Sequence, residues 1–359
     1  MRVSRIVTVS DNEYFYTAGY FNTNKWLDNE HLIAVRSNRK TAGAQKNLKD
    51  VNEIIEISLK DGGIRVLCDD LLSFEEYIVF GNYVYYSNGY QLKQIDCYTG
   101  ENKFICESPF VNKCNEPPAL SPFFQQLSIT GDGKYIMSCV FTDKKEACML
   151  RIDVASGKYG IILKKHFEMP FWDPGHLMVC PTDTNKFFYC HEGNTFYISN
   201  RLWIYDCSTG RDKNIAKQRL GDNGELIDCF GHEMWAPDGR GIYFVKYACS
   251  PDKPTGICYA DISTGKYKLL YTGHKYWHVS VSRDGRYLAS DTQSDDYISE
   301  VFIIDTTDGR EYRIADAKTD WQHPCHPHPN ISPDNDKVVF TALDDNGRTC
   351  IKIAYLSFD

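Results

Sequence analysis

Three histidines stand close together near the C-terminal end of the chain, in the string WQHPCHPHPN. They are His323, His326 and His328, and the prolines between them hold the backbone extended. A single histidine is more often a structural residue than a ligand. Imidazoles repeated at such short intervals instead favour a site for a divalent metal such as Mn, Fe, Co, Ni or Zn, with open positions for a substrate.

Further polar residues share one position relative to the turns of the chain. Four of them stand six residues before the aspartate of a turn such as SRDG. A fifth aligns on the proline of its turn, and a sixth is found by counting back from Asp28 in the weaker turn LDNE. In chain order these residues are Asn22, Gln126, His176, His232, His278 and His328. Four of the ten histidines share this position, and a chance distribution would scatter them.

Two kinds of hairpin alternate along the chain and must position these residues. The first ends an apolar strand with Asp-x-x-x-Gly and occurs five times, in IDCYTG, IDVASG, YDCSTG, ADISTG and IDTTDG. The second is a Pro/Asp/Gly turn between hydrophobic strands, as in WAPDGRGIYFV. Two hairpins in each unit of about fifty residues give four strands, the content of one propeller blade. We therefore predict an all-β, seven-bladed β-propeller of four-stranded antiparallel blades around a central channel, as a single domain over residues 1–359.

The propeller prediction brings the shared position together in space. The innermost strand of each blade runs along the channel, so equivalent residues of successive blades converge at one end. We expect His278 to join His326 and His328 in a metal site there. The polar residues 37–50 are expected to be an excursion within the first blade, and the final strand TCIKIAYL to pair with the N-terminal segment RIVTVS, which removes a sheet edge.

Composition limits the possible partners. The net charge is −8, without an evident basic surface, which argues against a general nucleic-acid or anionic-membrane binder and requires any attraction for an anionic substrate to be local. Neither a signal peptide nor an apolar run long enough to span a membrane is evident. The 14 cysteines are scattered without a C-x-x-C pair, as free thiols in a reducing compartment would be. We expect a cytoplasmic protein.

The ordered strings GHLMVCPTDTNKFFYCHEG, NRLWIYD, GHEMWAPDGRGIYF, HVSVSRDG and HPHPNISPD resemble the oligogalacturonate lyases, polysaccharide lyase family 22. The likeness covers most of the chain and is strongest over residues 172–340. It implies a seven-bladed propeller that cleaves short galacturonides by β-elimination, assisted by a divalent metal usually described as manganese. The substrate would be a small anionic oligosaccharide from pectin breakdown.

The resemblance also assigns roles to residues. The family's metal ligands are three histidines and a glutamine, the last three spaced Q-x-x-H-x-H. In this chain His323 stands in the place of the glutamine, with Gln322 one position earlier, so either is open as the fourth ligand beside His326, His328 and His278.

The remaining roles concern the reaction itself. The family's base falls on His232 of GHEMW, and its substrate-binding arginine on Arg201 of NRLWIY. A metal on the uronate carboxylate would stabilise the enolate-like intermediate, and a neutral His232 would take the C5 proton. Arg201 would hold a second carboxylate through a bidentate pair.

Further substrate contacts are expected from four polar residues. They are His176, His191, Asn22 and Gln126. Two other functions remain open: a non-catalytic propeller of the TolB type that binds a ligand or a protein partner, and a lyase acting on a different uronide.

Overall fold

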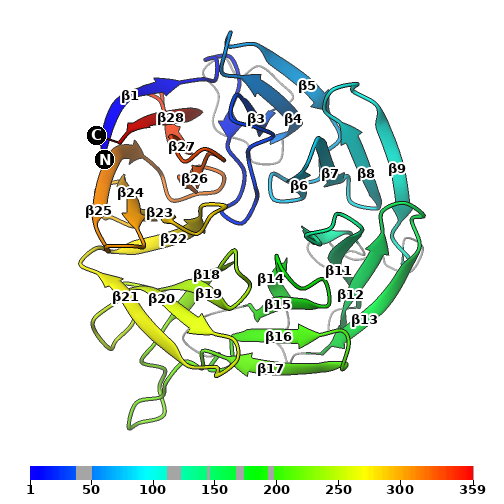
Figure 1. Ribbon diagram of the computed structural model, residues 1–359, viewed down its shortest axis with the longest axis vertical. Helices are drawn as coiled ribbons and strands as arrows, with labels where there is room; N and C mark the ends of the chain where they lie inside the picture. The colour runs from blue at the N-terminus through cyan, green and yellow to red at the C-terminus, as the bar shows by residue number, and fades with distance from the viewer. Residues whose placement is uncertain (38–50, 111–122, 144–145, 167–173, 193–197, 359) are drawn as a thin grey trace. The chain divides into compact units, whose positions relative to one another are not determined.

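The computed structural model describes residues 1–37, 51–110, 123–143, 146–166, 174–192 and 198–358. These residues form seven four-stranded antiparallel sheets and no helix, which confirms the predicted all-β fold of seven blades (Figure 1). Most of the segment 37–50 lies outside the described residues, between the paired strands β3 and β4. Among the described residues no helix is long and apolar enough to cross a membrane.

Within each sheet, every strand is hydrogen-bonded to the strand named next to it. The seven sheets consist of β2 (Tyr16–Thr17), β3 (His31–Ser37), β4 (Val51–Ser58) and β5 (Ile64–Cys68); β6 (Tyr77–Phe80), β7 (Tyr83–Ser87), β8 (Gln91–Asp96) and β9 (Asn102–Glu107); β10 (Gln125–Ile129), β11 (Tyr135–Asp143), β12 (Glu146–Asp153) and β13 (Tyr159–Lys165); β14 (Pro174–Val179), β15 (Lys186–His191), β16 (Leu202–Asp206) and β17 (Arg211–Ile215); β18 (Phe230–Trp235), β19 (Gly241–Lys246), β20 (Gly256–Asp261) and β21 (Tyr267–Thr272); β22 (Tyr276–Val281), β23 (Tyr287–Thr292), β24 (Ile298–Asp305) and β25 (Glu311–Lys318); and β1 (Arg2–Thr8), β28 (Thr349–Ser357), β27 (Lys337–Leu343) and β26 (Asn330–Ile331).

The chain divides into two compact units. Unit 1 comprises Met1–Val84, Asp96–Gly100 and His274–Asp359, and unit 2 comprises Tyr85–Ile95 and Glu101–Gly273. In unit 1, the first strands of two sheets, β22 and β26, contact each other. In unit 2, β14 contacts both β10 and β18 in the same way. In these three pairs the first strand of one sheet lies against the first strand of the next, where β26 counts as the first strand of the sheet that holds both chain ends.

The Asp-x-x-x-Gly turns have one geometry. In all five, the glycine N–H donates to the aspartate carbonyl at 2.8 Å, and the glycine has a φ between 66° and 74°. The aspartate carboxylate also accepts hydrogen bonds within the turn, as Asp261 Oδ1 does from the Thr264 N–H at 2.9 Å. An L side chain is disfavoured at such a φ, which explains why glycine closes every copy. These turns join the third and fourth strands of their sheets.

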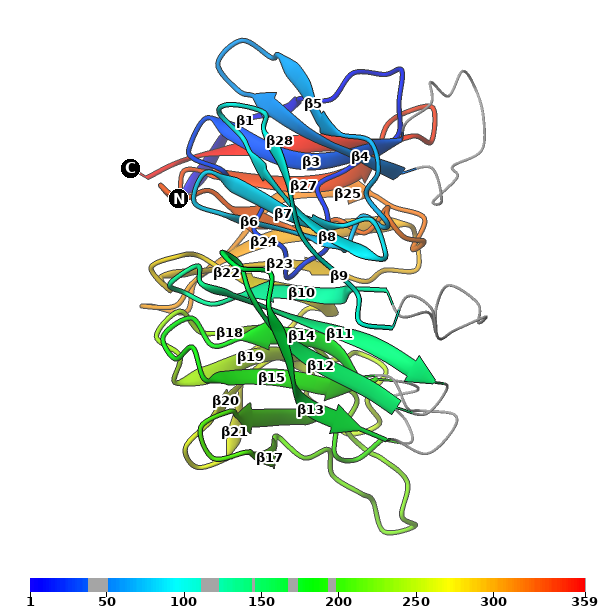
Figure 2. The same cartoon turned by 90° about the vertical axis from the view of Figure 1, so that its right-hand side faces the viewer.

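The two chain ends complete one sheet in unit 1. Strand β1 pairs antiparallel with β28, with Arg2 opposite Ser357 and Thr8 opposite Lys352. Both views show the N-terminal strand beside the C-terminal one (Figures 1 and 2). This confirms the predicted pairing of the two terminal segments.

Apolar side chains fill the space between neighbouring sheets of each unit. In unit 1, Val301 and Ile303 of β24 pack in one cluster with Val338 and Phe340 of β27. In unit 2, a comparable cluster joins side chains of β15 and β16 to those of β19 and β20. Thirteen cysteines of the described residues are free, and all but two of these are buried. The cores hold the first strands in place, and Gln126, His176, His232 and His278 lie on those strands.

Candidate active site

At Gln126, His176 and His232, the shared position found in the sequence is a bulge in the first strand of a sheet. Gln126, His176, His232 and His328 have φ values of 57°, 50°, 54° and 44°. In three of these sheets the strand register shifts at that residue. A left-handed conformation costs a non-glycine residue about 1–2 kcal/mol, and such strain concentrates at functional sites. The bulge turns these side chains out of the regular alternation of the strand.

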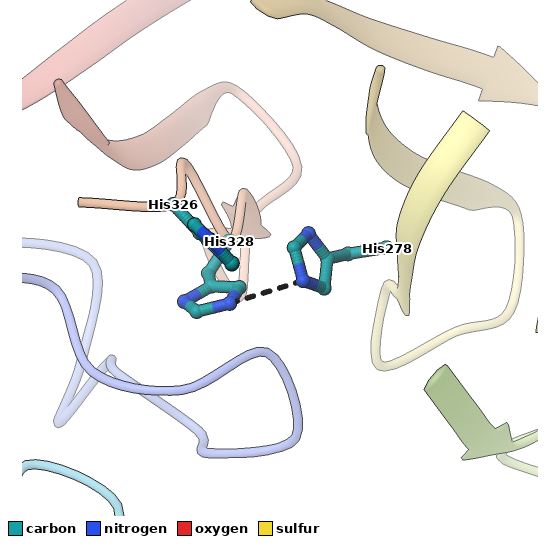
Figure 3. Close-up of side chains that lie close together, drawn as sticks. All are labelled: His278, His326 and His328. Atoms are coloured by element: carbon teal, nitrogen blue, oxygen red, sulfur yellow. Dashed lines mark hydrogen bonds between the residues drawn. The ribbon is translucent and has the colours of Figure 1, made fainter. Parts of the chain in front are cut away.

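Three histidines of unit 1 form a compact nitrogen cluster. His278 lies on β22, and His326 and His328 lie on the segment before β26, with their rings facing one another (Figure 3). One ring nitrogen from each lies within 4.8 Å of those of the other two, and all three residues are buried. The Nε2 atoms of His278 and His328 are 3.2 Å apart. The structure therefore brings together three of the four predicted metal ligands.

Hydrogen bonds at the Nδ1 atoms of His278 and His328 determine which ring nitrogen of each histidine carries the hydrogen. The Nδ1 of His328 lies 3.1 Å from the carbonyl oxygen of Gly19, which can only accept, so Nδ1 carries the hydrogen. The Nδ1 of His278 lies 2.8 Å from Oδ1 of Asp291 and donates to it in the same way. The two Nε2 atoms, 3.2 Å apart, can then share one proton in an N–H···N hydrogen bond, or present two lone pairs to a cation. This donor set fits a divalent metal, with outer partners that orient the ligands.

The Asp291 carboxylate orients two histidines of the cluster through hydrogen bonds. It also accepts the backbone N–H of His278 at 2.9 Å and that of His328 at 3.1 Å. Burial raises the pKa of Asp291 to about 7, and these two backbone hydrogen bonds and the charge of Lys25 oppose that rise. A cation at the imidazoles would favour the ionised carboxylate further.

A loop of the first sheet closes around the same cluster. The Tyr20 ring contacts the His328 ring edge to face at 5.0 Å, and the Phe21 ring stacks on His278 at 5.8 Å. Lys25 is fully buried, and its ammonium group donates to the Tyr20 carbonyl at 2.7 Å. Burial lowers the pKa of Lys25 to about 7, against the opposing charge of Asp291. The loop thus supplies aromatic walls and one backbone acceptor.

His323 lies at the margin of the cluster. Its ring centroid is 4.1 Å from that of His326 and 5.7 Å from that of His328. It is not a member of the compact group of three whose nitrogens lie within 4.8 Å of one another. Gln322 is exposed, and its carbonyl accepts the N–H of Cys325 at 2.7 Å. The His323 ring therefore contacts the cluster, and the choice between His323 and Gln322 as the fourth ligand stays a prediction.

A second cluster, in unit 2, is built on buried ion pairs. The Arg201 Nε donates to Glu233 at 2.7 Å, and its Nη2 donates to Glu192 at 2.6 Å. The His176 Nδ1 lies 2.8 Å from Glu233 and 3.4 Å from Glu192. Although burial alone would raise it, the pKa of Glu233 is held well below its usual range by Arg201 and His176. Cys190 also adjoins these groups, but burial raises the pKa of its thiol well above its usual range.

Arg201 has different partners from those expected for a substrate-binding arginine. It is 2% exposed, and its guanidinium binds Glu192 and Glu233. It supplies one positive charge to two carboxylates, and His176 is the other basic group bound to them. A contact between Arg201 and a substrate carboxylate stays a prediction.

His232 lies beside His176 and has a neutral partner. The two rings stack at 5.9 Å with an angle of 24° between their planes. The His232 Nδ1 is 3.0 Å from the hydroxyl of Tyr247. A Cβ atom added to Gly231 would lie 1.8 Å from that hydroxyl oxygen, so the glycine before His232 makes room for Tyr247. The structure therefore brings His176, His232 and Arg201 into one buried neighbourhood.

The other expected substrate contacts are more dispersed. His191 ends β15, and its backbone N–H donates to the Arg201 carbonyl at 2.7 Å. Gln126 lies on β10 at its bulge, and Asn22 is half-buried in a turn after β2 rather than on the strand. Their roles toward a substrate stay predictions.

Sequence reasoning missed the residues that surround the histidines. They are Asp291, Lys25, Glu192, Glu233 and Tyr247. Two of them carried a usable signal, because Glu192 and Glu233 each follow a histidine directly, in CHEG and GHEM. Asp291 lies in β23 and Tyr247 directly follows β19, and only the pairing of strands brings them to their histidines.

Known proteins are similar to this chain in sequence and in fold. The family profile described as oligogalacturonate lyase matches residues 127–357. Two curated relatives are the oligogalacturonide lyase of Pectobacterium atrosepticum, 27% identical over 224 residues, and the oligogalacturonate lyase of Dickeya dadantii, 23% identical over 227 residues. Each alignment covers 57% of this chain and 54% of the relative, so the chain spans about half the length of the curated relatives it matches.

The likeness in fold extends over almost the whole chain. A solved oligogalacturonate lyase in complex with manganese covers 99% of this chain and 95% of its own, with a TM-score of 0.79 and 17% identity. The family profile spans well over half of the sequence, and the matched residues contain both histidine clusters. The chain therefore belongs to the oligogalacturonate lyase family.

Proposed function

We propose that this protein is a metal-dependent lyase that cleaves short galacturonide oligosaccharides by β-elimination. One observation carries the proposal: the Nε2 atoms of His278 and His328 face each other at 3.2 Å, each on a ring whose Nδ1 is held by an acceptor. Such a pair is prepared to bind a cation, and membership of the oligogalacturonate lyase family supplies the reaction in which that cation acts.

The metal would be held by His278, His326 and His328, with His323 as the fourth ligand. The manganese complex of the related lyase supports Mn²⁺ as the ion. When bound, a divalent ion supplies positive charge to a uronate carboxylate and so makes the adjacent C5 proton more acidic. It also supplies local attraction for an anionic substrate in a chain of net charge −8.

The protein's own residues carry the proton chemistry. His232 takes the C5 proton as a neutral imidazole, with its Nδ1 against the Tyr247 hydroxyl and its Nε2 as the basic atom. Arg201 holds Glu192 and Glu233 in place and is the remaining candidate for a substrate carboxylate. His191, Asn22 and Gln126 would contact sugar hydroxyls.

The substrate class fits a cytoplasmic enzyme of pectin breakdown. A buried triad of histidines suits a small anionic oligosaccharide, and a net charge of −8 gives no basis for a nucleic-acid or membrane partner. The free thiols of the described residues support a reducing compartment.

A substrate panel tests the proposal. Purified protein with Mn²⁺ is incubated with di- and trigalacturonate, and with oligomers of glucuronate as a matched comparison, while the ultraviolet absorbance of the unsaturated product is followed. We expect product from the galacturonides. Product only from glucuronate oligomers would assign the enzyme to a different uronide. Silence with every uronide, despite bound metal, would favour a non-catalytic ligand-binding propeller.

A further inference from the structure

The histidines at positions 176 and 232 occupy equivalent places in consecutive sheets of unit 2. Each stands at the bulge of a first strand with a left-handed backbone, and each directly follows a glycine. The glycines pair across the sheet in the same manner, Gly175 with Cys190 and Gly231 with Val245. The two imidazoles therefore have the same backbone setting.

Their partners differ in charge. The space that a Cβ at Gly175 would fill is occupied by Glu192, at 2.1 Å from its Cγ, whereas the same space at Gly231 is occupied by Tyr247. Glu192 and Tyr247 each follow the residue paired with the glycine by two positions. One histidine thus has a carboxylate where the other has a phenol.

We propose that His176 is the proton donor to the oxygen that leaves C4 of the uronide, while His232 accepts the proton from C5. This inference rests on the proposed lyase function and adds the acid to it. Two like groups placed in environments of opposite character are the usual arrangement for an acid and a base acting in one reaction.

The charges around His176 favour its protonated form. Burial acts to lower its pKa, but the charge of Glu192 and the hydrogen bond and charge of Glu233 outweigh burial and raise it, while Arg201 opposes them. Arg201 binds both glutamates, and together with His176 it holds the pKa of Glu233 well below its usual range, so that Glu233 stays ionised beside the imidazole. The His232 ring and the Cys190 thiol, whose pKa burial raises, also adjoin it.

The proton balance of the step is complete without an added reactant. His232 removes the C5 proton, and the electrons of the C5–H bond form the C4–C5 double bond. The C4–O4 bond breaks with its electrons on O4, and His176 gives O4 the proton of its Nε2, since its Nδ1 is bound to Glu233. Solvent afterwards protonates His176 and removes the proton from His232.

A leaving-group experiment separates the acid from the base. His176→Ala should slow digalacturonate elimination by about 10²–10⁴-fold. The same variant should lose far less with a galacturonate that carries a nitrophenyl ether at C4, because nitrophenolate leaves without protonation. His232→Ala should lose as much with both substrates. His274→Ala, which changes a half-buried histidine bound to Glu300 and Glu311, serves as the control and should keep the wild-type rate.

A pH profile tests the role of the glutamates as positioning residues. The alkaline limb of kcat/KM should report deprotonation of His176. Glu233→Gln removes a negative neighbour and should move this limb to lower pH. If that variant fails to fold, Glu192→Gln, whose side chain is 25% exposed, makes the same comparison. An alkaline limb that stays in place in the folded variant would overturn the proposal.

Failure of the proposed lyase function and failure of the proposed acid role of His176 would give different results. A wild-type protein that eliminates no uronide contradicts the lyase function itself. A wild-type protein that turns over, with a His176→Ala variant that is folded, binds Mn²⁺ and keeps a rate within about threefold of wild type, contradicts only the role of His176 as acid.

Discussion

At the scale of single residues, the site depends on which nitrogen of each histidine is held. His278 and His328 could be predicted from their spacing as neighbours, because a repeat places equivalent residues together. Their hydrogen-bond partners could not, since the Gly19 carbonyl comes from a segment distant in sequence and the Asp291 carboxylate meets His278 only through the register of β22 and β23. The Gly19 carbonyl belongs to the backbone, so no residue type in the sequence indicates its role.

The roles of metal ligand and base should separate in two variants. His326→Ala removes one imidazole of the compact triad and should lose bound Mn²⁺ and turnover together. His232→Ala leaves the triad intact and should keep the metal but lose turnover. Metal content by atomic emission and the rate of product formation check both. If His232→Ala retains a near-wild-type rate, the base is another residue.

Asp291 should matter for metal affinity although it is not in the triad. Asp291→Asn keeps the size but replaces an acceptor with an amide, which weakens the control of the His278 tautomer. We expect Mn²⁺ affinity to fall about 10–100-fold. Titration followed by electron paramagnetic resonance measures it, with the exposed turn residue Asp296→Asn as control. Equal affinities for the two variants would show that Asp291 does not orient a ligand.

At the scale of elements, the turns could be predicted and the bulges could not. In the Asp-x-x-x-Gly pattern, the glycine N–H binds the aspartate carbonyl, and the glycine has a positive φ that other residues rarely adopt. The five copies of the pattern therefore identified the hairpins. A bulge adds one residue to a strand without a residue type of its own. The alignment on turns found the position of His176 and His232, but not the left-handed backbone that directs their side chains.

Gly231 should be required before His232, because Tyr247 occupies the space that a side chain at position 231 would need. Gly231→Ala places a methyl group on the Tyr247 hydroxyl and should lower the free energy of unfolding by about 1–3 kcal/mol. In a Tyr247→Ala background the same change should cost clearly less. Denaturant unfolding of the four proteins measures the coupling.

A second glycine provides the control for this cycle. Gly160→Ala meets no atom within 4 Å and should stay within about 0.5 kcal/mol of the wild type. Additive effects of Gly231→Ala and Tyr247→Ala would mean that the close approach does not determine the residue at position 231.

At the scale of the whole molecule, the repeat predicted the number and type of sheets, because each repeat of two hairpins must bury its apolar faces against a neighbouring repeat. The pairing of the chain ends also followed from the need to cover a sheet edge, and β1 lies on β28 as expected. The two compact units were not foreseen, because one of their boundaries passes through the sheet of β6 to β9, although the other, at Gly273 and His274, lies between two sheets.

Removal of the N-terminal strand should destabilise the protein out of proportion to its length. Deleting residues 1–8 uncovers the edge of β28. We expect a lower thermal midpoint and concentration-dependent aggregation, because an exposed edge can pair with another chain. Calorimetry and light scattering check this. An unchanged midpoint would show that β1 adds nothing to the stability of its sheet.

The central claim is that elimination requires a metal at the histidine triad. The most direct measurement prepares the protein free of metal with a chelator, then titrates it with Mn²⁺ while binding and digalacturonate elimination are followed in the same samples. We predict that the metal-free protein is inactive and that the rate rises in proportion to occupancy, reaching its limit at about one ion per chain. Full activity without metal, or no activity at full occupancy, would contradict the account.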